Sequence, residues 1–393
     1  MQSYVDQNRI AGLSTLIARK GKVVHYNQVG QMDKEANQPM TSEAIFRIYS
    51  MTKPIVCTAL MTLFEQGCFR LIDPVSKFIP AFRKMNVLQH DESGNTKTVR
   101  AQRPITIRDL LTHTAGLTYD FLDDTPVNKL YRDARLLGNA DRTLEAMVQE
   151  LASLPLAYQP GTKWHYSFSI DVAAHLVEIL ANQPLRSFLK EKIFVPLGMQ
   201  DTDFCIPPEK MGRHVKTYGI ADLGTEGMTL GKMVEIWKEG VNQYIDLSET
   251  YPHSTPDVFA RGGHGLFSTA ADYFRFAQML LNKGELAGVR ILGRKTLEFM
   301  HTNHLPAHLI PYNLANVVFW NGYGYGLGSR VMMNLGESDV LSSIGEFGWS
   351  GAAKTYYWVD PQEDMIGILM SQCLGFELPE KDFQVLAYQA LID

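Results

Sequence analysis

FRIYSMTKPIV, residues 46–56, combines a largely apolar run, a short polar segment and then Pro54 with further apolar residues. Proline lacks an N–H and is tolerated in the first turn of a helix but not in its interior. We therefore expect a buried helix to begin at Ser50 and to run to about Phe69. Two interpretations follow from this stretch alone. Ser50 and Lys53 are the nucleophile and base of a serine hydrolase, or they are the polar opening of an ordinary helix.

The spacing of Ser50 and Lys53 suits acyl transfer. A serine hydroxyl is a weak nucleophile until a nearby group takes its proton. A lysine three residues later lies on the same helix face, and burial would lower the pKa of its amine. Free N–H groups at a helix start also favour a developing oxyanion. A second Ser-x-x-Lys, Ser187 to Lys190, sits in the charged segment RSFLKEK, where we expect both side chains to face water.

Composition narrows the possible functions. The chain has 393 residues, 45% of them hydrophobic and 20% charged, with a net charge of −5. These values are typical of a globular protein long enough for two structural regions. The sequence contains no basic run of the kind that predicts binding to nucleic acid or to an anionic membrane. It also contains no apolar run long enough to span a membrane. No signal peptide is visible at the N-terminus, so we expect a cytoplasmic protein that acts on a small molecule; the oligomeric state is left open.

Several other motifs are weak. The four cysteines lack metal-type spacing, and His301 and His304 have no accompanying acidic ligand, so we expect no metal and no cofactor. The segment after Gly348 fails the last position of the lipase elbow G-x-S-x-G, which argues against an α/β-hydrolase. We expect His113 to be a structural residue at a helix end. His264 could lie near a cleft, without an assigned role.

Periodicity outlines the fold. Residues 12–31 predict a β-hairpin turning at 20–22, and residues 86–103 predict a polar exposed loop. Residues 105–200 are mostly helical, and an irregular region follows to about 260. Residues 268–284 predict a helix with Ser268 as its N-cap. Period-two patterns then predict three strands, and a helix closes the chain; these segments are 322–333, 351–360, 364–372 and 381–392.

Strands at both ends with helices between them predict an α/β (α+β) fold. We expect one region to comprise residues 1–80 plus 260–393. Residues 81–259 would form a mostly helical inserted domain. A cleft between the two would be the active site.

Two later blocks strengthen the catalytic interpretation. WHYSFS, residues 164–169, contains Tyr166, and EFGWSGAAKTYYWVDP, residues 346–361, begins a glycine-flanked strand. With these blocks the chain resembles the serine β-lactamase and penicillin-binding-protein superfamily, and within it the class C β-lactamase-like carboxylesterases of family VIII. The resemblance spans nearly the whole chain and also includes LLTHTAGL (110–117), YQPGTKWHYSFS (158–169) and GGHGLFSTAADYFRFAQML (262–280). It implies an antiparallel sheet flanked by helices.

The resemblance also implies roles. Ser50 would be the acylated nucleophile, Lys53 its activating partner, and Tyr166 a partner in proton transfer. Which of Lys53 and Tyr166 is the base stays open. The backbone N–H groups of Ser50 and Ala352 would form the oxyanion hole. Gly351 would let the strand backbone pass close to the substrate.

The chain departs from the β-lactamase pattern at two positions. Trp349-Ser350-Gly351 stands where those enzymes carry Lys-Thr-Gly, which removes a cation that would hold a substrate carboxylate. Phe168 replaces an asparagine and cannot bond an amide side chain. Both changes favour neutral, apolar esters. We also expect Tyr119 and Phe121 to line the acyl pocket.

These features predict a serine carboxylesterase that hydrolyses short-chain esters through an acyl-enzyme on Ser50. An acyltransferase on the same scaffold is the first alternative. A β-lactamase or D-Ala-D-Ala peptidase is the second, and the shared nucleophile leaves weak β-lactam hydrolysis open. A catalytically silent binding protein is disfavoured because Ser50, Lys53 and Tyr166 are all present.

Overall fold

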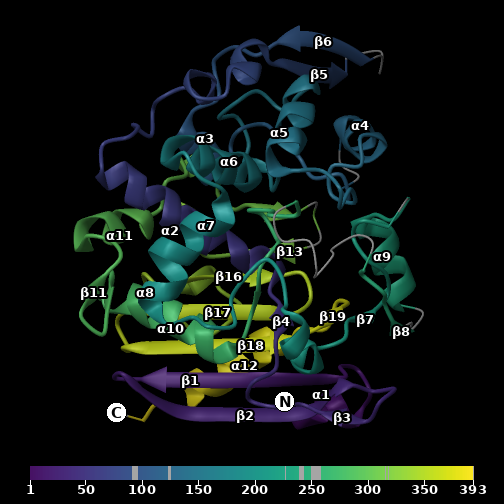
Figure 1. Ribbon diagram of the computed structural model, residues 1–393, viewed down its shortest axis with the longest axis vertical. Helices are drawn as coiled ribbons and strands as arrows, with labels where there is room; N and C mark the ends of the chain where they lie inside the picture. The colour runs from purple at the N-terminus through teal and green to yellow at the C-terminus, as the bar shows by residue number, and fades with distance from the viewer. Residues whose placement is uncertain are drawn as a thin grey trace.

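An eight-stranded antiparallel sheet forms the base of the molecule (Figure 1). The computed structural model describes residues 1–90, 96–122, 125–225, 227–238, 243–248, 258–314, 316 and 318–392. In spatial order the strands are β14 (Tyr323–Tyr325), β15 (Arg330–Met332), β16 (Phe347–Gly351), β17 (Thr355–Asp360), β18 (Met365–Ser371), β1 (Gly12–Arg19), β2 (Lys22–Asp33) and β3 (Gln38–Pro39).

The sheet joins the two ends of the chain. β1 pairs with β18, so that Leu13 lies opposite Ser371, and on its other side β1 pairs with β2. The predicted hairpin at residues 12–31 is confirmed, and its turn uses positive φ angles at Lys20 and Gly21. The predicted antiparallel sheet flanked by helices is also confirmed.

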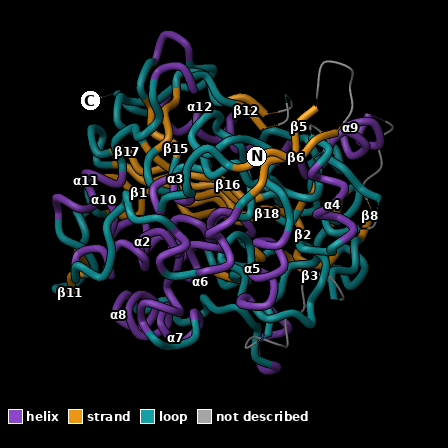
Figure 2. Tube along the Cα trace, turned by 90° about the horizontal axis from the view of Figure 1, so that it is seen from above, coloured by secondary structure: helices purple, strands orange, loops and turns teal. Residues whose placement is uncertain are grey.

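The two faces of the sheet are covered by different helices. Alternate residues of β17 and β18, such as Tyr357 and Ile368, enter the main core, against which α10 (Ala270–Leu281) packs. The residues between them, such as Trp358 and Leu369, form a separate core with α12 (Pro379–Gln389). Both faces are therefore apolar, as expected of a central sheet between helical layers. Figure 2 shows α12 on one side of the strands and five helices on the other, namely α2 (Thr52–Glu65), α5 (Leu144–Ser153), α6 (Ser169–Ala181), α7 (Leu185–Leu189) and α8 (Val195–Leu197).

Helix α2 (Thr52–Glu65) runs through the centre of the molecule and is buried along most of its length. It packs against α6 (Ser169–Ala181), which in turn contacts α3 (Ile107–Leu111) and α5 (Leu144–Ser153). A helix that is apolar on all sides belongs in such a core. The predicted helical content of residues 105–200 is confirmed. The remaining α-helices are α1 (Gln2–Asp6), α4 (Val127–Asp133), α7 (Leu185–Leu189), α8 (Val195–Leu197), α9 (Leu230–Lys238) and α11 (Arg294–Met300).

The prediction of an exposed loop at residues 86–103 is wrong. β5 (Asn86–His90) and β6 (Thr96–Arg100) form a hairpin, whereas residues 91–95 lie outside the described part of the chain. The backbone N–H of Leu156 donates to the carbonyl of Asn86 at 2.8 Å, and Val87 is fully buried. The many polar residues of this hairpin lie on its exposed side, which concealed the two-residue period.

The glycine-rich segment 322–333 is a hairpin and not a single strand. β14 and β15 pair across a turn in which the Gly326 N–H donates to the Ser329 carbonyl. Gly328, with φ +96°, lies against Cys57 of α2: a Cβ there would be 2.5 Å from the Cys57 sulfur. This glycine therefore lets the turn approach the central helix closely.

The predicted N-cap of the helix at 268–284 is off by one residue. The side chain of Thr269 accepts the N–H of Asp272 and caps α10, whereas Ser268 belongs to β9 (Phe267–Ser268), which pairs with β4 (Phe46–Arg47). The region up to residue 260 contains a 3₁₀ helix (Pro208–Arg213), α9 and short strands that include β7 (Tyr218–Gly219) and β8 (Gln243–Tyr244). Residues 226, 239–242 and 249–257 of that region lie outside the described residues.

Within the described ranges, none of the helices combines the length and the apolar character needed to cross a lipid bilayer.

Candidate active site

Ser50 lies in a tight turn that leads directly into α2. Residues 49–51 form one 3₁₀ turn, and Tyr49 adopts φ +44°, an uncommon angle for a tyrosine. Two side chains hold the turn from the sheet side and the helix side. Thr355 Oγ1 donates to the carbonyl of Ile48 at 3.1 Å, and the Tyr273 hydroxyl donates to the carbonyl of Met51 at 3.0 Å. The nucleophile candidate is thus fixed at the start of a buried helix.

The Lys53 amine contacts the Ser50 hydroxyl. Its Nζ donates to Ser50 Oγ at 3.1 Å and to the backbone carbonyl of Gly263 at 2.7 Å, and the side chain has no solvent exposure. Burial lowers the pKa of Lys53 to about 7, although the negative charge of Asp171 acts in the opposite direction. A substantial fraction of Lys53 is therefore a neutral amine near neutral pH, able to take a proton.

Tyr166 lies on the other side of this pair. Its ring centroid is 4.5 Å from Lys53 Nζ, and its hydroxyl oxygen accepts the indole N–H of Trp349 at 3.2 Å. Burial raises the pKa of Tyr166, while hydrogen bonds with Ser50 and Trp349 act against that rise. The side chain is therefore a neutral phenol at neutral pH, within hydrogen-bonding reach of Ser50.

Asp171 and Gly263 support Lys53 and were not found from the sequence. The Gly263 N–H donates to Asp171 Oδ1 at 2.9 Å, and the carbonyl of the same glycine accepts Lys53 Nζ. Asp171 is fully buried, and burial raises the pKa of its carboxyl group. The one available signal was an acidic residue in the otherwise apolar run SIDVAAHLV, five residues after Tyr166.

The C-terminal end of β16 forms one wall of the site. Trp349 stacks on Trp320 with the ring centroids 5.4 Å apart, and Gly351 and Ala352 follow it. A Cβ at Gly351 would lie 2.1 Å from Thr355 Oγ1 and 2.4 Å from the carbonyl oxygen of Ile48. The close approach that this glycine permits in the structure is therefore to the turn that carries Ser50, and the predicted approach to a substrate stays a prediction.

A cavity of about 760 Å³ opens onto Ser50. Most of the predicted site residues line it, namely Ser50, Tyr119, Phe121, Tyr166, Trp349, Gly351 and Ala352. The sequence did not reveal the rest of the wall. One part comes from α9, with Leu230, Met233, Val234 and Trp237, and another from the C-terminal third, including Trp320, Arg330, Lys354, Glu380 and Lys381. The cavity is of the size that holds a drug-sized ligand.

Phe168 does not belong to the described lining of this cavity, which corrects its prediction as a substrate-binding residue. It is fully buried at the start of α6, and its ring lies 4.5 Å from that of Tyr119. Phe168 supports the cavity wall from behind because an aromatic ring at this position fills the core between Tyr119 and Tyr131.

The histidines have structural surroundings. His113 is buried next to α3, with its ring 4.7 Å from that of Tyr166 and Nδ1 3.3 Å from Ser167 Oγ. His264 lines the cavity, and burial together with the charge of Lys53 holds its pKa well below the ordinary value. His301 stacks on Phe347 at 3.6 Å.

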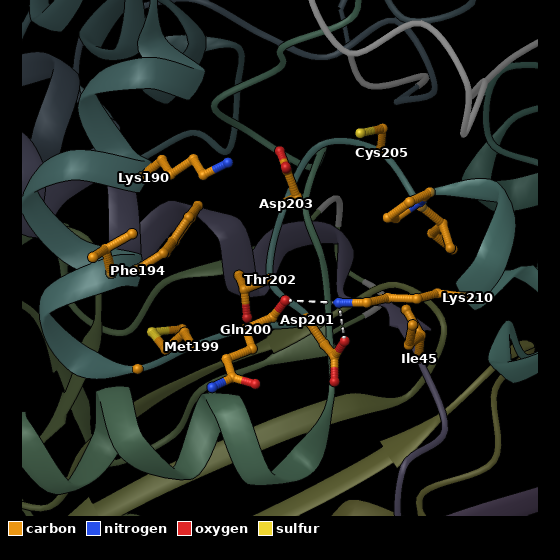
Figure 3. A pocket seen from close by; sticks show the side chains of 14 residues that line it. Ile45, Lys190, Phe194, Met199, Gln200, Asp201, Thr202, Asp203, Cys205 and Lys210 are labelled. Carbon is orange, nitrogen blue, oxygen red and sulfur yellow. Dashed lines mark hydrogen bonds and ion pairs between the residues drawn. The ribbon is translucent and has the colours of Figure 1, made fainter.

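A second cavity of about 290 Å³ lies beside α8 (Figure 3). Three of its charged side chains, those of Asp201, Asp203 and Lys210, are in ion pairs. Lys210 lies 2.7 Å from Asp201, which also binds Arg213, and Asp203 is bound by Arg186 at 2.7 Å. The rejected motif Ser187 to Lys190 is near this region, and both residues are exposed on the surface, as predicted.

Comparison with known proteins finds a matching family and relatives that include esterases. A family model described as Beta-lactamase matches residues 1–390. Protein Rv1367c of Mycobacterium tuberculosis is 33% identical over 375 residues, covering 95% of this chain and 88% of that protein. Esterase EstB of Burkholderia gladioli is 29% identical over 275 residues, covering 68% and 65%. The solved structure of EstCE1, a hydrolase with promiscuous acyltransferase activity, aligns with a TM-score of 0.77 and 25% identity, covering 98% of this chain and 96% of that chain.

Proposed function

Because this chain belongs to the Beta-lactamase family, we propose that it is a serine carboxylesterase that hydrolyses carboxylic esters through an acyl-enzyme on Ser50. The family and its esterase and acyltransferase relatives support a serine hydrolase or acyl-transfer enzyme in general. One observation supports the specific assignment most strongly. The Ser50 hydroxyl lies 3.1 Å from the amine of a lysine that is completely buried.

In the acylation step, Ser50 Oγ attacks the ester carbonyl carbon while its proton passes to neutral Lys53. We assign the base role to Lys53 because its pKa is near 7, whereas burial keeps Tyr166 protonated. The carbonyl oxygen becomes an oxyanion, which the N–H groups of Ser50 and Ala352 would stabilise. As the C–O bond to the alcohol breaks, Tyr166 gives its proton to the leaving oxygen and recovers one from Lys53.

In the deacylation step, water takes the place of the alcohol. It loses a proton to the Lys53–Tyr166 pair as it attacks the acyl carbon, and Ser50 Oγ regains a proton when the acyl bond breaks. The buried indole of Trp349 donates to the Tyr166 oxygen at 3.2 Å and so stabilises any negative charge that forms there during either transfer. Small neutral esters are the proposed substrates, since Trp349 occupies the position where β-lactamases carry a lysine.

Acyl transfer to an alcohol is a second candidate function. A cavity of about 760 Å³ has room for an acyl group together with an acceptor molecule. Proteins named as acyltransferases also align with this chain, among them monacolin J acid methylbutanoyltransferase of Aspergillus terreus, which is 28% identical over 271 residues. Adding an alcohol such as 1-butanol to the assay and measuring the new ester against free acid separates transfer from hydrolysis.

Hydrolysis of p-nitrophenyl acetate, butyrate and octanoate, and of nitrocefin, tests the proposal with wild type and Ser50→Ala. We expect the wild type to cleave the esters much faster than nitrocefin. Ser50→Ala should lose at least about 10⁴-fold in kcat/KM because the nucleophile is absent. A wild type without ester hydrolysis, or a Ser50→Ala variant with full activity, would refute the proposal.

A further inference from the structure

Lys354 and Glu380 form a charged pair on the wall of the cavity that contains Ser50. Lys354 lies two residues after Ala352 in the turn between β16 and β17, where it adopts φ +61°. Glu380 lies in the first turn of α12. The turn that carries the proposed oxyanion N–H therefore also brings a lysine to the substrate cavity. Lys354 thus supplies a cation a few residues after Trp349, the position at which β-lactamases carry a lysine.

The polar atoms of this pair are poorly satisfied. Lys354 Nζ and Glu380 Oε1 are 3.6 Å apart, which is too long for a hydrogen bond, although the side chains are only 12% and 16% exposed. Among the described residues, no group hydrogen-bonds Lys354 Nζ, and Glu380 Oε2 is buried with no hydrogen-bond partner. By contrast, the buried ion pair of Arg330 and Glu346 closes to 2.9 Å. Buried polar atoms normally have partners, so within the described part of the chain Glu380 Oε2 is a buried acceptor that lacks one, and the donor Lys354 Nζ lies beside it without a hydrogen bond.

The opposite charges of Lys354 and Glu380 determine which ligand group they can bind. A substrate carboxylate could bind Lys354 but would be repelled by Glu380, and a substrate ammonium group would meet the reverse arrangement. The neighbouring wall residues Lys381 and Asp339 are paired with each other and add no net charge. A hydroxyl group can accept from Lys354 Nζ with its lone pairs and donate its proton to Glu380 Oε2.

We propose that Lys354 and Glu380 form a subsite that binds a hydroxyl group of the ester substrate. The proposal rests on the carboxylesterase function above and narrows its substrate class to esters that carry a hydroxyl group away from the scissile bond. The apolar walls contributed by α9 would hold the hydrocarbon part of such a molecule. A plain short-chain ester would be cleaved but would leave the subsite without its ligand.

Matched pairs of esters test this subsite. Pentyl butyrate and 4-hydroxybutyl butyrate differ only by CH₃ and OH at the end of the alcohol, and methyl hexanoate and methyl 5-hydroxypentanoate differ likewise at the end of the acyl chain. Shorter and longer pairs scan the distance from the ester. We expect the hydroxylated member to have about tenfold higher kcat/KM at one chain length, because a site built for a hydroxyl rejects the analogue that lacks it.

Substitutions connect the preference to the pair. Lys354→Met and Glu380→Gln should each reduce the hydroxyl preference to less than about twofold, which corresponds to losing one of the two hydrogen bonds. Glu380→Gln also leaves Lys354 without its counter-charge, so the relative kcat/KM for the matching carboxylate ester should rise. A purely structural role for the pair would not produce that gain. Lys295→Met is the control because Lys295 is 78% exposed and pairs with Glu298 on α11; it should retain the wild-type preference.

Rates are expressed per active site, counted by labelling Ser50 with a fluorophosphonate, so that partial unfolding of a variant does not enter the ratio. The subsite is overturned if the alkyl ester is preferred at every chain length, or if the hydroxyl preference survives both substitutions. An enzyme that labels at Ser50 and cleaves alkyl esters without any hydroxyl preference overturns the subsite alone. An enzyme that cleaves neither member of any pair overturns the carboxylesterase function and the subsite together.

Discussion

Asp171 reaches Lys53 through a single intervening residue. Gly263 donates its backbone N–H to Asp171 Oδ1 at 2.9 Å and accepts Lys53 Nζ on its carbonyl oxygen at 2.7 Å. The carboxylate thus anchors the glycine whose carbonyl binds the amine, and its charge favours the protonated form of Lys53. The charge state of Lys53 thus depends on a side chain 118 positions later in the sequence, that of Asp171.

Asp171→Asn should move the acid limb of the activity profile to lower pH. Lys53 must be neutral to act as a base, so kcat/KM rises as pH passes through its pKa of about 7. The carboxylate raises that pKa, so removing its charge lowers it, while the amide oxygen of asparagine can still accept from Gly263. The other titratable groups around Lys53, namely Cys57, Tyr119, Tyr166, His113 and His264, are unchanged.

The measurement is the pH dependence of kcat/KM for p-nitrophenyl butyrate. Asp272→Asn is a matched control because Asp272 is also mostly buried but binds Thr202 and the N–H of Asp201. Its profile should keep the wild-type midpoint. An unchanged or raised midpoint in Asp171→Asn would contradict the role given to this carboxylate.

Lys53→Met should remove a pH dependence of stability. The pKa of Lys53 is about 7 in the folded protein and 10.5 when the group is unperturbed. Between these values the unfolded chain binds more protons, so the free energy of unfolding of the wild type rises with pH relative to the variant, by up to about 1.4 kcal/mol per pH unit. Urea titrations at pH 7 and pH 9.5 measure the difference. Lys190→Met, at an exposed position, should show no such change.

Tyr166→Phe should lower kcat by roughly 10²–10⁴-fold because it removes the group proposed to transfer the proton to the leaving alcohol. The fold should be retained, since the ring still fills its place between His113 and Trp349. Tyr131→Phe is the matched control: Tyr131 is also buried, but its hydroxyl donates to the Pro155 carbonyl. Steady-state kinetics together with thermal melting distinguish the two variants, and equal activities would exclude the proposed role of Tyr166.

Gly351→Ala should displace β16 from the nucleophile turn. The added Cβ would lie 2.1 Å from Thr355 Oγ1 and 2.4 Å from the Ile48 carbonyl, and a backbone oxygen cannot rotate away. We expect a loss of roughly 1–3 kcal/mol in unfolding free energy together with a loss of activity. Gly212→Ala, where a Cβ would have nothing within 4 Å, serves as the control and should leave both quantities unchanged. A fully active and stable Gly351→Ala variant would show that the two segments are not tightly joined.

Local patterns predicted the elements whose signals are local. The turn at Lys20–Gly21, the proline in the first turn of α2 and the strands flanking Asp360 were all identified from neighbouring residues. The β5–β6 hairpin was missed because its exposed residues are polar and its support, the backbone of Leu156, is distant in the sequence. Thr269 and Ser268 are equally plausible caps until the pairing of β9 excludes the second.

The candidate site shows the same limit. Ser50, Lys53 and Tyr166 occur in recognisable motifs, and the structure brings them together. Asp171 acts through Gly263, and Lys354 meets Glu380 only because the β16–β17 turn lies against α12. Such contacts are determined by tertiary packing. The periodicity of a single sequence predicts helices and strands but not which of them meet. Phe168 was misplaced for a related reason, since its motif position does not indicate which side of the wall its ring occupies.

The pairing of β1 with β18 has a consequence for biosynthesis. Strand β1 is synthesised long before its neighbour β18, which ends at Ser371, so one edge of the β1–β2 hairpin stays open until β18 has followed. Contacts so distant in the chain also slow folding. Ser50 and Lys53 are likewise made long before Trp349, which lines the cavity that opens onto Ser50. We therefore expect the nascent chain to need protection from aggregation until β16, β17 and β18 have been released.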